Sequence, residues 1–199
     1  MSDFRSERTL GERIKSLRRQ RGIRSTNELA NLTEGAVSAW TLQNLESGRK
    51  QDLNVSSLLN LAMALKVAPG LLLAPMARPD HRLDLPGLTE AFTEMTTGEF
   101  DAWFSGLPEG ATRTASGEDR NERIELQAFR ELVSLARERR RLRTMLVLES
   151  EAASTDALGQ VLAGNTKGRL DDIERHIAEL SGFLRKAGWE LGDWASGHG

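Results

Sequence analysis

The sequence of 199 residues contains no cysteine and only three histidines. Without thiols the chain forms no disulfide, no thiolate zinc site, no iron–sulfur cluster and no cysteine redox switch. The histidines, His81, His176 and His198, are scattered, and no two of them have the spacing of neighbours on a helix. We therefore expect neither a metal nor a cofactor.

The sequence also lacks long apolar runs. No stretch is long enough to span a bilayer, and the first residues, MSDFRSER, have no apolar core of the kind that a secretory signal needs. These features predict a soluble cytoplasmic protein that does not bind membranes. Extended strand-like alternation and a histidine-centred catalytic triad are missing as well, so we do not expect an enzyme.

Charge is distributed unevenly, although the formal net charge is only −2. Residues 1–78 contain 12 lysines and arginines against 7 acidic residues, whereas residues 79–199 contain 15 against 22. A basic segment followed by an acidic one suits a nucleic-acid-binding module joined to an assembly or sensing region.

The first half contains the start and stop signals of several short helices. Thr9 and Glu12 have the spacing of a capping box, and Gly22 is placed as a left-handed cap at the end of the same helix. Ser25 and Glu28 repeat the capping-box spacing before the apolar residues of NELANL. Two more helices are predicted further along, one over residues 55–67 and one beginning at a proline, residue 69.

A helix over residues 38–47 has two contrasting faces. Ser38 is a suitable N-cap, and the residues around it, Val37 and Leu42, are placed as a hydrophobic staple. At about 100° per residue, Leu42 and Leu45 lie on one side of this helix. The opposite side collects Trp40, Gln43, Asn44 and Ser47.

Five short helices, with a tight turn containing Gly35 between the second and the third, predict a helix-turn-helix domain. The motifs LGERIKSLRRQRG, NELANL, VSAWTLQNLESGRK and SSLLNLAMALKV, taken in this order, resemble the Cro/repressor (XRE-like) helix-turn-helix family of bacterial and phage transcription regulators. The resemblance extends from Thr9 to Pro75. The stretch from Leu29 to Glu46 is slightly longer than is usual in that family.

The resemblance implies a double-stranded DNA operator as partner, with helix 38–47 in the major groove. Amide side chains can pair with adenine, and apolar groups can pack on a thymine methyl. The candidate base contacts are Ala39, Trp40, Thr41, Gln43 and Asn44. The candidate phosphate contacts are Ser25, Thr26, Asn27, Ser47, Arg49 and Lys50. The resemblance further implies an ion pair between Arg18 and Glu46 that ties the recognition helix to the first helix.

Other roles for these residues remain open. The polar face of helix 38–47 could be merely solvated, and Trp40 could pack beside Val37 or at an interface. Arg49 and Lys50 could also interact with the C-terminal end of the preceding helix.

The second half is predicted to contain a linker over 76–86, short aromatic-rich helices over 87–107 and a helical hairpin over 108–199. Its last helix has a coiled-coil-like seam, which we predict to be a dimer interface. That seam consists of Leu170, Ile173, Ile177, Leu180 and Leu184. GNTKG, residues 164–168, is predicted as a turn, and the arginine run at 137–143 as a solvated face.

Together these features predict an all-α protein in which a five-helix Cro/repressor-type domain, residues 1–75, precedes a helical, coiled-coil-like region. The leading interpretation is a dimeric transcription regulator, a repressor of phage, mobile-element or host promoters. The alternative is an antitoxin-like or other interaction protein whose C-terminal helices bind a partner and whose helix-turn-helix only autoregulates.

Overall fold

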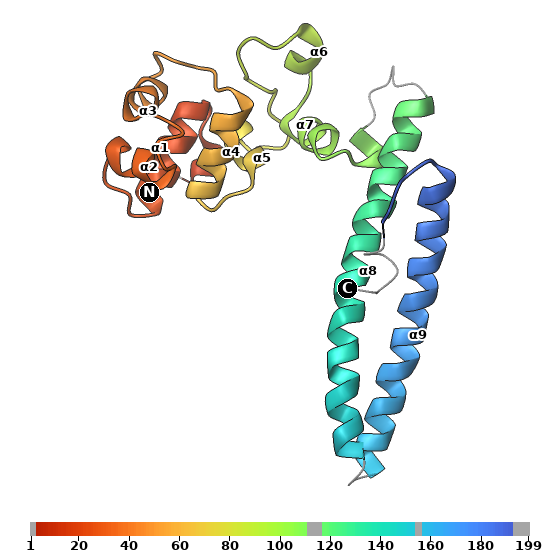
Figure 1. The fold of residues 1–199 in the computed structure, drawn as a ribbon. Helices are drawn as coiled ribbons and strands as arrows, with labels where there is room; N and C mark the ends of the chain where they lie inside the picture. Colours follow the sequence, from red (N-terminus) through yellow and green to blue (C-terminus); the bar gives the residue numbers. More distant parts are fainter. Residues whose placement is uncertain (1–2, 111–116, 154–156, 193–199) are drawn as a thin grey trace. The chain divides into compact units, whose positions relative to one another are not determined.

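The computed structural model describes residues 3–110, 117–153 and 157–192. Within these ranges the secondary structure is helical, apart from one isolated antiparallel bridge between Arg82 and Thr96, which confirms the predicted all-α class. No helix of the described ranges is long and apolar enough to cross a membrane. The chain forms two compact units, residues 1–105 and 106–199 (Figure 1).

The first unit consists of short helices, and the second is dominated by two long ones (Figure 1). The elements of the first unit are η1 (Phe4–Ser6), α1 (Leu10–Gln20), α2 (Thr26–Leu32), α3 (Ala39–Glu46), α4 (Val55–Ala64), α5 (Pro69–Leu73), α6 (Glu90–Thr93) and α7 (Thr97–Phe104). Those of the second are η2 (Pro108–Gly110), α8 (Gly117–Ala153) and α9 (Ala157–Lys186).

The predicted N-caps of α1, α2 and α3 are present, but the second capping box is incomplete, because the Glu28 carboxylate accepts from the N–H of Arg24 instead of that of Ser25. Thr9 accepts a hydrogen bond from the backbone N–H of Glu12, and the Glu12 carboxylate accepts one from the N–H of Thr9, which completes the capping box of α1. These bonds lower the pKa of Glu12. Gly22 has the expected left-handed conformation, with φ of 75°. Ser38 caps α3 through the N–H of Thr41.

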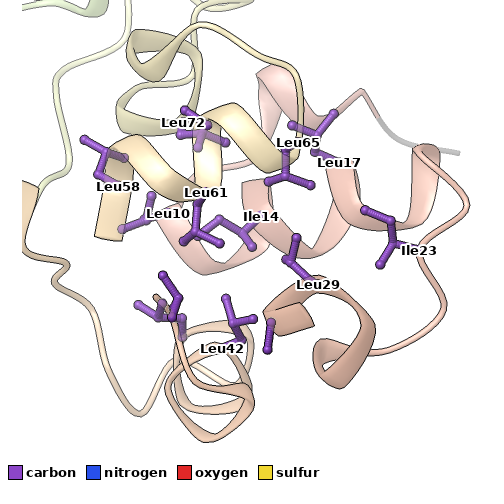
Figure 2. Close-up of a cluster of buried hydrophobic side chains, with 14 of the residues drawn as sticks. Leu10, Ile14, Leu17, Ile23, Leu29, Leu42, Leu58, Leu61, Leu65 and Leu72 are labelled. Atoms are coloured by element: carbon purple, nitrogen blue, oxygen red, sulfur yellow. The ribbon is translucent and has the colours of Figure 1, made fainter. Parts of the chain in front are cut away.

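Apolar side chains from all five of the first α-helices converge on one core (Figure 2). The fully buried members include Ile14 of α1, Leu29 of α2, Leu42 of α3, Leu61 of α4 and Leu72 of α5. Each comes from the apolar side of its helix, so helix periodicity alone accounts for its position.

Two residues of α1 hold this unit together in ways that the sequence did not indicate. Gly11 lies directly against the α3 backbone, where a Cβ atom would be 2.7 Å from the carbonyl carbon of Leu45 and closer still to its oxygen. Arg13, which belongs to the basic sequence RIKSLRR, is fully buried. Its guanidinium donates to four backbone carbonyls, those of Glu7, Arg8, Leu72 and Leu73. Burial lowers the pKa of Arg13 to about 10.

The segment predicted as a linker over 76–86 is packed onto the first unit. Leu83 is only 4% exposed and forms a small cluster with Ala74 and Phe100. Trp103 and Phe92 pack edge-to-face beside this cluster, with ring centroids 4.9 Å apart. The aromatic helices over 87–107 therefore find much of their apolar partner surface within the same unit, and Phe104 stays about half exposed.

The second unit is a hairpin of α8 and α9, which lie side by side (Figure 1). The prediction of a turn at residues 164–168 is wrong, because these residues lie inside α9. Neither glycine of GNTKG breaks the helix, since a lone glycine costs only about 1 kcal/mol relative to alanine in a helix interior. The connection between the two helices falls at residues 154–156, outside the described ranges.

The predicted dimer seam is covered by α8 of the same chain. Leu170, Ile177 and Leu184 are at most 9% exposed, and the seam residues Ile173 and Leu180 pack against the core that Ile177 and Leu184 form with α8. The antiparallel α8 of the same chain therefore covers Leu170, Ile177 and Leu184, whereas Ile173 and Leu180 stay partly exposed. The seam is used within the hairpin, and its use by a second copy stays a prediction.

Candidate nucleic-acid interface

The inner face of α3 is fixed by packing and by one ion pair. Leu42 and Leu45 are buried in the core of the first unit. At the end of the same helix, Glu46 meets Arg18 of α1 in a bidentate pair, with Nε–Oε1 at 2.6 Å and Nη2–Oε2 at 2.7 Å. Both side chains are less than 10% exposed. The hydrogen bonds with Glu46 raise the pKa of Arg18, against the opposing effect of burial.

The turn between α2 and α3 is closed by one buried hydroxyl. Thr33 Oγ1 donates to the carbonyl of Ala30 and accepts from the N–H of Val37, at 2.8 and 3.1 Å. The next two residues, Glu34 and Gly35, both have positive φ angles, 53° and 80°. The turn therefore contains a left-handed pair of residues, and α3 starts at its Ser38 cap as predicted.

The outer face of α3 presents four polar or aromatic side chains in a narrow arc. Positions 40, 43, 44 and 47 fall within about 100° around a helix axis. Trp40 is 70% exposed, Gln43 and Ser47 are exposed, and Asn44 is half-buried. Trp40 thus does not pack beside Val37, which is buried.

The other two candidate base contacts flank this arc. Ala39 is half-buried and packs against the core. Thr41 is also half-buried, and its hydroxyl lies 2.9 Å from that of Ser38 at the helix cap. Both are therefore less available to a ligand than the four residues of the arc.

The candidate phosphate contacts lie at the surface on both sides of α3. At the start of α2, Ser25 and Asn27 are exposed and Thr26 is half-buried, while the Ser25 hydroxyl caps the helix through the N–H of Glu28. After α3, Arg49 is exposed, and the Lys50 ammonium lies 3.1 Å from a carboxylate oxygen of Asp52. Lys50 is thus already partly neutralised.

One surface cation near this face was missed in the sequence. Arg24 directly precedes the Ser25 cap of α2 and is exposed, while its backbone N–H is bound by Glu28 at 2.7 Å. The signal in the sequence was its position directly before the Ser25 cap. The free N–H groups of the first helical turn can bind an anion there, and a neighbouring cation can bind the same anion.

Known proteins give no guide to the role of these residues. No family model, curated protein or solved structure matches the chain. In the described ranges, no group of three or more histidine, aspartate or glutamate side chains is arranged to hold a metal ion. What stands out chemically in the first unit is a helix with an anchored inner face and an amide-bearing outer face.

Proposed function

We propose that this chain is a sequence-specific DNA-binding transcription regulator of the Cro/repressor-like helix-turn-helix type, with α3 as its recognition helix. The observation that carries the proposal is the outer face of α3, on which Trp40, Gln43 and Asn44 extend from a helix whose inner face is fixed by Leu42, Leu45 and Glu46. A rigidly held helix with an amide-bearing face suits direct reading of bases.

The dimensions of α3 are compatible with this role. An α-helix with its side chains is about 10–12 Å across, which fits a B-DNA major groove about 12 Å wide, and the eight residues of α3 extend over roughly 12 Å of its axis. Gln43 and Asn44 carry amides that can make bidentate hydrogen bonds with adenine, and the Trp40 ring can contact a thymine methyl or the sugar–phosphate backbone.

Phosphate contacts would supply most of the affinity. Arg49, which is exposed after α3, is the strongest candidate, and Arg24 before α2 extends the basic surface on the other side. Lys50 must exchange Asp52 for a phosphate, so we rank it below Arg49.

We also propose that the regulator acts as a homodimer, because two linked copies would read two half-sites and make the second binding event effectively intramolecular. We assign no residues to this interface, since the seam of α9 is used within the hairpin.

A partner-binding role for the hairpin is the second candidate. Five large aliphatic side chains are 45–63% exposed toward the ends of α8 and α9 that the 154–156 connection joins. They are Val147, Leu148, Leu158, Val161 and Leu162.

Selection of bound fragments from a random double-stranded DNA library tests the main proposal. The full-length protein should enrich a short common motif. Equal recovery of all sequences would contradict sequence-specific reading and would favour the partner-binding role of the hairpin.

A further inference from the structure

α4 has apolar side chains on its outer side as well as on its inner side. Leu58 and Leu61 point into the core of the first unit (Figure 2). On the outer side, Val55, Leu59 and Met63 are 71%, 50% and 80% exposed. They follow one another at intervals of four residues, so they form a single stripe within about 80° of arc, which we call the α4 stripe. A helix that is apolar on all sides is normally buried, which indicates that another surface covers the α4 stripe.

The α4 stripe lies on a helix without charges. None of the ten residues of α4 is acidic or basic. Binding to DNA phosphates would need cations, which α4 lacks. The core of a protein–protein interface, in contrast, is depleted in charged residues, and three adjoining apolar side chains suit it. The α4 stripe is therefore suited to contact with another protein surface.

Opposite charges lie beyond the two ends of α4, at equal distances along the chain from Leu59. Asp52 precedes Leu59 by seven residues and Lys66 follows it by seven, and both are exposed. Arg21 donates a hydrogen bond to the Lys66 carbonyl at 3.3 Å, which adds a second cation at that end. At the other end, an Asp52 carboxylate oxygen lies 3.1 Å from the Lys50 ammonium. The α4 stripe thus runs between a carboxylate and an ammonium group.

We propose that the α4 stripe is the interface of the homodimer, covered by the α4 stripe of a second copy in antiparallel orientation. A two-fold axis through Leu59 places this leucine against Leu59 of the second copy. The same axis places Val55 against Met63 of the second copy, so a short side chain meets a long one. It also brings Asp52 toward Lys66 of the second copy. A parallel arrangement would bring Asp52 toward Asp52 of the second copy, so the charges favour the antiparallel one.

The α4 interface presupposes the homodimer proposed above, whereas base reading by α3 does not depend on it. The interface also bears on Lys50, which is paired with Asp52 and must exchange that carboxylate for a phosphate in order to bind DNA. In the dimer, Lys66 of the second copy can bind Asp52 instead. Formation of the dimer thereby makes Lys50 available to DNA.

The α4 contact alone should give a weak dimer. Ten residues make a helix of about 15 Å. One pair of such helices covers less than the roughly 800 Å² per copy of a standard stable interface. We therefore expect the free protein to exchange between monomer and dimer, and two adjacent DNA half-sites to hold the dimer together.

Sedimentation velocity of the full-length protein without DNA, over a wide range of concentrations, tests the interface. The wild type should shift from monomer toward dimer as its concentration rises. L59D should weaken the dimer by at least about 100-fold, because two carboxylates would meet at the two-fold axis. L32D is the matched control, because Leu32 of α2 is 52% exposed, much like Leu59, and it should dimerise like the wild type. Circular dichroism should show the wild-type helix content for both variants.

Charge reversal tests the antiparallel orientation with exposed side chains. D52K and K66D should each weaken the dimer by about tenfold, because each places like charges together at two symmetry-related positions. The double variant D52K/K66D should dimerise like the wild type, because it restores opposite charges at both positions. Lys66 has a φ of 53°, a conformation that aspartate tolerates, so K66D should fold normally.

Three results would overturn the proposal. Dimerisation of L59D equal to that of the wild type would place the interface elsewhere and leave the homodimer intact. A D52K/K66D variant that dimerises more weakly than both single variants would exclude the antiparallel arrangement. A wild type that is monomeric at every concentration would contradict both the homodimer and its α4 interface. Selection of a common DNA motif by such a monomer would still support base reading by α3, so the two proposals can fail separately.

Discussion

At the scale of single residues, two arginines of α1 show how a basic pattern can mislead. Arg13 and Arg18 both belong to the basic sequence RIKSLRR, yet both are buried in the structure, and only the Arg18–Glu46 pair was predicted. Arg13 binds backbone carbonyls, and Arg18 binds Glu46 and the carbonyl of Ile23. Both guanidinium groups are bound inside the unit and are not available to DNA phosphates.

The Arg18–Glu46 pair gives a direct prediction about stability. E46A should lower the free energy of unfolding of the first unit by about 3–5 kcal/mol, because it leaves the buried Arg18 charge without its partner. The double variant R18M/E46L should recover most of that loss, since apolar side chains of similar size can fill the site.

Chemical denaturation of the two single variants and the double variant measures this coupling. Strictly additive losses would show that the two residues do not interact. A loss below about 0.5 kcal/mol for E46A would place the pair among ordinary surface ion pairs.

Gly11 gives a second prediction at this scale. G11A should strongly destabilise the first unit, because the new Cβ would collide with the Leu45 carbonyl group and push α3 away from α1. G164A is the matched control, since a Cβ atom added to Gly164 inside α9 would meet nothing within 4 Å. It should stabilise its helix by up to about 1 kcal/mol. Thermal melts of both variants check this, and an unchanged G11A melt would refute the close approach.

At the scale of elements, the hairpin seam leads to a prediction about Ile177. I177D should unfold the hairpin, because a carboxylate would replace a side chain that is 4% exposed and packed against α8. F183D is the control, because Phe183 is 44% exposed on the same helix. Circular dichroism reports whether α8 and α9 stay helical, and sedimentation reports whether the protein is monomeric or dimeric. Together they distinguish a seam within the hairpin from a seam between two copies. An I177D variant that keeps its full helix content but is monomeric, while the wild type is dimeric, would show that the seam is a dimer interface.

The elements also show where sequence reasoning succeeded and where it stopped. The starts of α1, α2 and α3 were predictable because Thr9, Ser25 and Ser38 signal helix starts locally. The contact of Gly11 with Leu45 joins two helices that are far apart in the sequence, so no local pattern predicts it. The hydrogen bonds of Thr33 depend on the conformation of the turn, which the sequence pattern does not specify. No turn forms at residues 164–168, because a glycine only weakens a helix and the helical periodicity continues on both sides of this segment.

At the scale of the whole molecule, the two units do not coincide with the charge boundary in the sequence. Residues 1–105 contain 13 basic and 13 acidic residues, because the acidic segment after residue 78 belongs to the first unit. The proposed DNA binding therefore relies on local charge around α2 and α3. Net charge gives it no support.

The boundary of the first unit gives a prediction of its own. A fragment of residues 1–105 should melt at a higher temperature than a fragment of residues 1–75, because the shorter one loses Leu83 and Phe100 and exposes Ala74. Each kcal/mol lost corresponds to about 4–8 °C in a domain of this size. Identical melting temperatures would show that residues 76–105 add nothing to the fold.

Base reading by α3 can be tested at one side chain, Asn44. Affinities of N44A should be measured for the selected DNA site and for its single-base-pair variants, with N60A as a control because Asn60 is an exposed amide on α4. We predict that N44A loses about 1–3 kcal/mol on the selected site and no longer discriminates at one base pair, while N60A binds like the wild type. An equal loss on every sequence, or no loss at all, would contradict the account.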